Sequence, residues 1–112
     1  MSATVLIISN GARTPVGLQA APSAAAVRAA ISGMREHPLL VDHFGEPVIG
    51  AFDRRLDPAL QGPDRLLALS ALALQEALWP LRETRASNLR LPVYLGLPEV
   101  RPGFTPRDIA QV

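Results

Sequence analysis

Four residues in one short segment have side chains that could bind a metal ion or transfer a proton. His37, Asp42, His43 and Glu46 occur within the stretch EHPLLVDHFGEP. Imidazole and carboxylate groups are metal ligands and general acids or bases, but metal sites hold their ligands at regular spacings on rigid elements. This stretch instead carries the prolines and the glycine that are typical of loops and turns. We therefore predict a solvated loop here, with no metal-binding or cofactor-binding residue.

The stretch SNGARTPVG, from Ser9 to Gly17, is the most distinctive in the sequence. Its glycines are too far apart for a dinucleotide-binding turn, and a P-loop requires a lysine, which the chain lacks. A structural interpretation is simpler. Gly11 and Gly17 would supply unusual backbone angles, and Pro15 would stiffen the crossover to the next element. We therefore favour a structural role over direct ligand contact.

The sequence offers no clear nucleophile for covalent catalysis. It contains no cysteine, which excludes disulfides, thiolate metal sites and a Cys nucleophile. None of its serines lies in the Gly-x-Ser-x-Gly elbow of serine hydrolases. The charged residues Asp53, Arg54, Arg55 and Asp57 alternate in sign, which predicts exposed ion pairs that each contribute little stability. We therefore assign no catalytic residue.

The composition indicates one folded unit with a core of small aliphatic side chains. The 112 residues are 48% hydrophobic and only 4% aromatic, and the net charge is +1. The arginines are scattered among acidic residues, so no basic surface for nucleic acid is expected. The apolar runs are too short for a signal-peptide core or for the ~20 residues of a membrane-spanning helix. We therefore expect a cytoplasmic chain that binds neither nucleic acid nor membranes.

Apolar runs predict three strands. They cover residues 4–9, 48–52 and 91–98, and they are continuous rather than alternating, as in strands that are buried on both faces. Residues 82–90 are predicted to be a polar surface connection. Helices between the strands would make right-handed βαβ units, which predicts a mainly parallel sheet.

Two helices are predicted between these strands. The first is rich in alanine, has Ser23 near its start as a cap, and must end before Pro38. The second begins at Pro63, a residue suited to the first helical position, and ends at Trp79 before the next proline. Apolar residues cover most of its circumference, which predicts a buried helix with Trp79 in the core.

The last ten residues, GFTPRDIAQV, begin a third helix. Thr105 is a good N-cap, Pro106 suits the first helical position, and Asp108 stands where a capping-box acid returns to the cap. Only residues 109–112 follow, and so short a helix is not stable alone in water. We expect it to dock on other structure or to continue in a longer chain.

Five segments follow one another along the chain: ARTPVG after the first predicted strand, AAAVRAAIS, EPVIGAFD, DRLLALSALALQEAL and LPVYLGLP. In this order they resemble the N-terminal part of β-ketoacyl synthases and other thiolase-like proteins. It implies an α/β fold, namely an incomplete thiolase-like half-domain with βαβαβ order, a mainly parallel sheet and packed helices. Residues 1–112 would form a single partial domain.

The resemblance also implies a function. Thiolase-like enzymes hold an acyl group as a thioester on a cysteine that follows the third strand, and acyl carrier protein or coenzyme A delivers that group. This chain has no cysteine, and neither His37 nor His43 corresponds to a catalytic histidine of the family. We therefore expect the N-terminal segment of an acyltransferase that is not catalytic alone and needs the remainder of the fold or a partner chain.

A second interpretation comes from a different class of function. The chain could be a small, non-catalytic α/β binding or assembly module, such as one associated with type VI secretion. In either case its open sheet edges lead us to expect an oligomer. An independent small enzyme with a polar site in residues 37–46 is the least supported interpretation.

Overall fold

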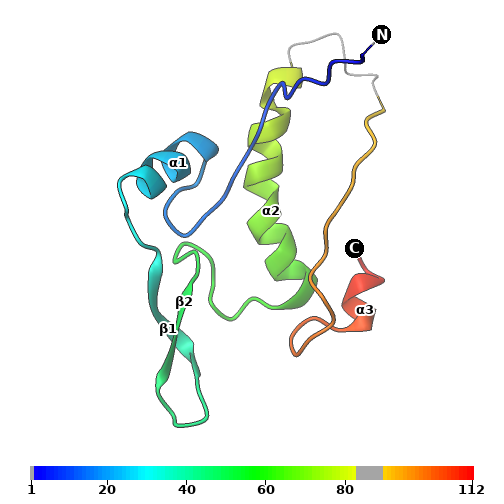
Figure 1. Cartoon of the computed structure of the whole chain (residues 1–112). Helices are drawn as coiled ribbons and strands as arrows, with labels where there is room; N and C mark the ends of the chain where they lie inside the picture. The colour runs from blue at the N-terminus through cyan, green and yellow to red at the C-terminus, as the bar shows by residue number, and fades with distance from the viewer. Residues whose placement is uncertain (1, 83–89) are drawn as a thin grey trace.

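The computed structural model describes residues 2–82 and 90–112 and combines helices with one two-stranded sheet (Figure 1). The predicted polar connection at residues 82–90 lies almost entirely outside the described residues. The elements are α1 (Ala20–Arg28), β1 (Met34–Val41), β2 (Pro47–Ala51), α2 (Gly62–Leu78), the 3-10 helix η1 (Trp79–Leu81) and α3 (Pro106–Ile109). The mixed α/β character agrees with the prediction, whereas the mainly parallel sheet does not appear.

Helix α1 ends earlier than the sequence predicts. Ala30 has a φ of 55°, and the N–H of Ile31 donates to the carbonyl of Ala26 at 2.9 Å. This is the Schellman arrangement that ends many helices, with alanine at the position where glycine is usual. The helix therefore ends at Arg28, well before Pro38, which was expected to terminate it. Ser23 lies inside α1, and Gln19 occupies the N-cap position.

The segment predicted as a loop forms a β-hairpin. Strand β1 pairs with β2 in antiparallel orientation, with Met34 opposite Ala51, Arg35 opposite Gly50, Glu36 opposite Ile49 and Val41 opposite Pro47. The strand predicted at 48–52 is therefore confirmed as β2, but its partner β1 was missed. The polar residues and the proline within β1 obscured its strand character, since proline cannot donate to a sheet ladder.

Helix α2 is the element that the sequence predicted most closely. It begins at Gly62 with a proline in its first turn and ends at Leu78, where η1 takes the chain past Pro80. None of its residues is buried, however. Trp79 is 55% exposed rather than in a core, and its ring contacts the Arg82 guanidinium, whose carbon lies 3.1 Å from the ring centroid.

Two of the three predicted strands do not form among the described residues. Segments 4–9 and 91–98 join no sheet, and Figure 1 shows each running past the helices as a bare coil. Val5, Ile7 and Tyr94 are 89%, 88% and 93% exposed. Segments that were expected inside a sheet are therefore open to solvent.

The described residues enclose very little apolar core. Ala26 and Phe104 are the apolar residues buried among them, and the radius of gyration is 17.4 Å. A compact chain of this length would have a radius near ~13 Å. Helix α3 has the capping box predicted from Thr105 and Asp108, and it packs near the start of α2 (Figure 1).

Candidate functional site

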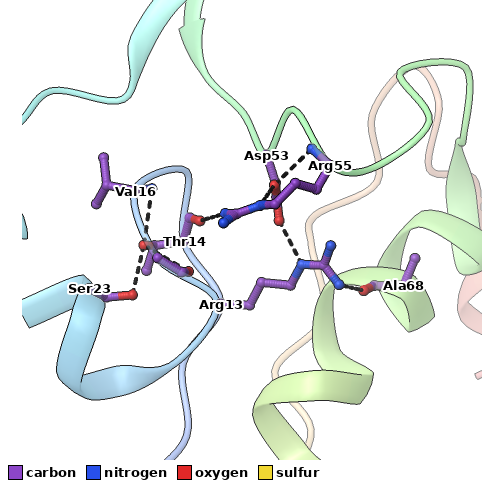
Figure 2. Close-up of polar contacts among 8 residues, drawn as sticks. Arg13, Thr14, Val16, Ser23, Asp53, Arg55 and Ala68 are labelled. Atoms are coloured by element: carbon purple, nitrogen blue, oxygen red, sulfur yellow. Dashed lines mark hydrogen bonds and ion pairs between the residues drawn. The ribbon is translucent and has the colours of Figure 1, made fainter.

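Buried charge is concentrated at Asp53, just after β2. Its side chain is 2% exposed. Its Oδ2 accepts a hydrogen bond from Arg13 Nε at 2.6 Å, and its Oδ1 accepts one from Arg55 Nε at 2.7 Å (Figure 2). The backbone N–H of Arg55 also donates to Oδ1, at 3.0 Å. We call these three residues the Asp53 cluster.

The two arginines of the Asp53 cluster connect three parts of the chain. Arg13 Nη1 donates to the carbonyl of Ala68 in α2 at 3.0 Å, and Arg55 Nη2 donates to the carbonyl of Thr14 at 3.0 Å (Figure 2). The cluster thereby joins the loop after the N-terminal segment, the turn after β2 and the middle of α2. Charged hydrogen bonds of this kind are stronger than neutral ones.

The electrostatics of the Asp53 cluster favour a carboxylate that is charged at neutral pH. Burial raises the pKa of Asp53, but hydrogen bonds from Arg55 and Arg13 outweigh it and lower the pKa to about 2. A general base works best when its pKa is near the operating pH. Asp53 is therefore suited to holding the two arginines and not to transferring protons at neutral pH.

Two hydroxyl groups lie beside the cluster. Thr14 Oγ1 and Ser23 Oγ are 2.9 Å apart, and Thr14 closes a tight turn in which its N–H donates to the carbonyl of Gly17 at 2.8 Å (Figure 2). Within the described part of the chain, neither hydroxyl contacts a histidine that could remove its proton. The pair therefore joins α1 to the turn and lacks the base that activates a nucleophile.

Glu76 of α2 holds both ends of the segment that leads into α1. Its Oε2 accepts a hydrogen bond from the N–H of Ala12 at 3.0 Å, and its two carboxylate oxygens accept from the N–H of Ala20 at 3.1 and 3.0 Å. Ala20 is the first residue of α1, whose N-cap residue Gln19 contributes no side-chain hydrogen bond. A carboxylate from another helix thus caps α1 at its positive end.

The glycines of the SNGARTPVG stretch are structural, but for a different reason from the predicted one. Neither has a positive φ. A Cβ on Gly11 would lie 1.9 Å from the carbonyl oxygen of Ala73, and a Cβ on Gly17 would lie 2.6 Å from the backbone nitrogen of Ser23. Glycine is required at both positions because backbones approach closely there.

The four residues considered as a metal or acid–base group are distributed along the hairpin. His37 and Asp42 use their side chains to accept backbone hydrogen bonds, and the His43 ring contacts the tilted ring of Phe44, with ring centroids 3.8 Å apart. Glu46 accepts from the Asp42 N–H through its backbone carbonyl. Across residues 2–82 and 90–112, no three metal-ligating side chains gather at one place.

The charged run after β2 differs from its prediction. Asp53 was expected in an exposed ion pair and is instead buried, while Arg54 is exposed and Arg55 is partly exposed. Alternating charges indicated an ion pair within the run, and the pair between Asp53 and Arg55 exists. Arg13 lies 40 residues away, and no local pattern linked it to Asp53.

The described residues also form an open groove of about 640 Å³. Its walls come from the hairpin, the start of α2 and residues 98–104, and most of them are apolar.

Within the described residues, no helix is long and apolar enough to cross a membrane. Comparisons of the chain with known protein families, with curated proteins and with solved structures found no match.

Proposed function

We propose that this chain is the N-terminal segment of a thiolase-like, β-ketoacyl-synthase-like acyltransferase and that it is not catalytic alone. One observation carries the proposal: segments 4–9 and 91–98 are apolar at successive positions, yet they are exposed and unpaired among the described residues. Strands that are apolar on both faces belong inside a covered sheet. Other parts of a thiolase-like fold would provide that cover and the missing strand partners.

The anchored geometry of the N-terminal region supports a scaffolding role. Segment 4–9 leads directly into Gly11 and Ala12, which are held against α2 by close packing and by Glu76. Arg13 is then fixed by Asp53. The exposed segment thus starts from a rigid base, which reduces the conformational entropy lost when it joins a sheet.

The acyl-transfer chemistry would have to come from outside these residues. A thioester intermediate requires a cysteine, and the chain has none. The remainder of the fold would provide the cysteine and its histidines, and acyl carrier protein or coenzyme A would deliver the acyl group. The role proposed for this chain is to complete the sheet on which that site is built.

The test uses the protein isolated from its native cells. We would measure the intact mass of the polypeptide containing this sequence and incubate the preparation with coenzyme A carrying a radiolabelled acyl group. The proposal expects a longer chain or a complex that gains a thioester-bound label, and prior alkylation of cysteine should abolish labelling. The 112-residue chain alone serves as the unlabelled control. A stable assembly that contains no acyl-accepting cysteine would refute the proposal and favour the assembly module.

A further inference from the structure

The β-hairpin contains an irregularity at its centre. Glu36 pairs with Ile49, and Val41 pairs with Pro47. Residues 37–40 on β1 therefore face the single residue 48 on β2. A bulge of this size leaves backbone groups without partners across the sheet, and water or a side chain must then hydrogen-bond them.

The His37 ring supplies the missing acceptor. Its Nδ1 accepts hydrogen bonds from the backbone N–H groups of Leu39 and Leu40, at 3.1 and 3.0 Å. The intervening Pro38 has no N–H, so these are the first two donors after the histidine. The ring also contacts Phe52 just after β2, with ring centroids 4.8 Å apart. The imidazole thus accepts hydrogen bonds from two N–H groups of the bulge, and its contact with Phe52 fixes the orientation of the ring.

This arrangement requires an uncharged imidazole. A neutral histidine has one nitrogen that donates and one that accepts, whereas both nitrogens donate in the charged form. A proton on Nδ1 would therefore remove the acceptor and place an N–H group against two other N–H groups. Histidine is the side chain whose unperturbed charge change falls between pH 5 and 8.

The other charged groups around the bulge are distinguishable from His37. Arg65 of α2 and Arg101 line the groove beside it. The titratable and charged residues of the hairpin and its turn are Arg35, Glu36, Asp42, His43 and Glu46. Among these, His43 is the other histidine, and its ring contacts Phe44, whereas His37 accepts the bulge N–H groups.

We propose that His37 is a proton-sensitive latch that holds the hairpin bulge closed when its ring is neutral and releases it when Nδ1 is protonated. The inference rests on the hydrogen bonds and register of the hairpin and is independent of the proposed function. Since His37, Leu40 and Val48 line the groove, release of the bulge also changes the shape of that groove. The hairpin would thereby respond to acidification.

The test is amide hydrogen exchange of the whole protein, followed by NMR from pH 5 to pH 8 and corrected for intrinsic exchange rates. The protection of Leu39 and Leu40 should fall about two- to tenfold as His37 becomes charged, as expected for the loss of a modest hydrogen bond. The Asp42 N–H, which donates to the Glu46 carbonyl at 2.8 Å, serves as the internal reference. Nitrogen shifts of the His37 ring report its protonation directly.

Three variants separate the latch from general effects of pH. His37→Asn offers an uncharged acceptor oxygen near the Nδ1 position and should keep both amides protected at every pH. His37→Ala should lose the protection at every pH, and His43→Gln should behave as the wild type. The proposal is overturned if protection at Leu39 and Leu40 stays constant while the His37 ring titrates, or if the neutral ring carries its proton on Nδ1.

Discussion

Asp53 has two arginine partners and almost no access to water. Its charged form therefore stabilises the folded arrangement of residues 12–17. Asp53→Asn keeps the shape of the side chain but leaves both guanidinium groups without a counter-ion. Breaking a buried ion pair on one side is strongly destabilising. We expect residues 12–17 to lose roughly 2 to 4 kcal/mol of local opening free energy, measured by hydrogen exchange of their amides.

Asp57→Asn is the matched control for that substitution. The Asp57 carboxylate accepts one hydrogen bond from the N–H of Ala59 in an exposed turn, and asparagine can still accept it. The control should change the same opening free energy by less than about 0.5 kcal/mol. Equal effects of the two substitutions would show that the Asp53 cluster does not stabilise the loop.

The low pKa of Asp53 also predicts how the loop responds to acid. Its pKa falls from an ordinary 3.8 to about 2 in the folded chain, so the folded state favours the charged form. The resulting stabilisation, about 2 kcal/mol, is fully present above pH 4 to 5 and is lost as the pH falls through 4 towards 2.

Hydrogen exchange in residues 12–17 during acid titration measures this loss, and Asp53→Asn should remove the pH dependence. The pKa of Asp108 is also lowered, by hydrogen bonds from the backbone and hydroxyl of Thr105. That group stabilises α3, so a readout confined to residues 12–17 excludes it. A wild-type loop that keeps its full protection at pH 2 would contradict the prediction.

The sequence could predict only part of this residue-scale arrangement. Alternating charges after β2 suggested a local ion pair, and Asp53 and Arg55 do form one. Burial of Asp53 depends on Arg13, which only the folded chain brings close. A buried ionic contact between distant residues has no periodic signal, whereas a cap such as Thr105 with Asp108 is contained within one turn.

At the scale of elements, the contact between Glu76 and the start of α1 is the most directly testable. Glu76→Ala removes every acceptor that Ala12 and Ala20 use in α2. Loss of an N-terminal cap with its charge typically costs about 1 kcal/mol. We expect faster hydrogen exchange throughout α1, corresponding to a loss of about that size.

Gln75→Ala is the control, because Gln75 is an exposed neighbour on the same helix. It should leave the exchange of α1 unchanged. Glu76→Gln, which keeps one acceptor oxygen and loses the charge, should fall between the wild type and Glu76→Ala. If Glu76→Ala and Gln75→Ala affected α1 equally, the proposed cap would be wrong.

Elements with strong local signals were predicted correctly, and those that depend on their neighbours were not. Helix α2 has Pro63 at its start and Pro80 after its end, and both act within one turn. Helix α1 ends at Arg28, and Ala30 just after it has a conformation that alanine rarely adopts, so helix propensity extended the prediction too far. Strand β1 was missed because Pro38 suggests a loop. In the structure, the bulge that contains Pro38 is held by backbone hydrogen bonds to the His37 ring.

At the scale of the whole molecule, apolar segments that the sequence predicts to be buried are exposed. Segments 4–9 and 91–98 were predicted as strands, but they form none among the described residues and pair with neither β1 nor β2. Patterns of apolar residues predict which side chains should be buried, not what buries them. The prediction of a buried α2 failed for the same reason, because burial depends on the layers packed around an element.

This exposure predicts the behaviour of the 112-residue chain alone. Large uncovered apolar surfaces and uncharged unpaired strands promote association, so the chain should bind a hydrophobic dye, form assemblies that grow with concentration and melt over a broad range. Ile7→Lys with Tyr94→Lys places a charge in each exposed segment. This variant should stay monomeric at concentrations where the wild type associates, with a radius of gyration near 17.4 Å by X-ray scattering.

Gln75→Lys combined with Gln111→Lys provides the comparison, since it adds the same two charges at exposed positions outside the two segments. It should associate like the wild type, because the apolar segments remain free to pair. If that control also became monomeric, general surface charge and not segments 4–9 and 91–98 would drive association. A wild-type monomer with a sharp cooperative melt would show that these segments are stable in water without a partner.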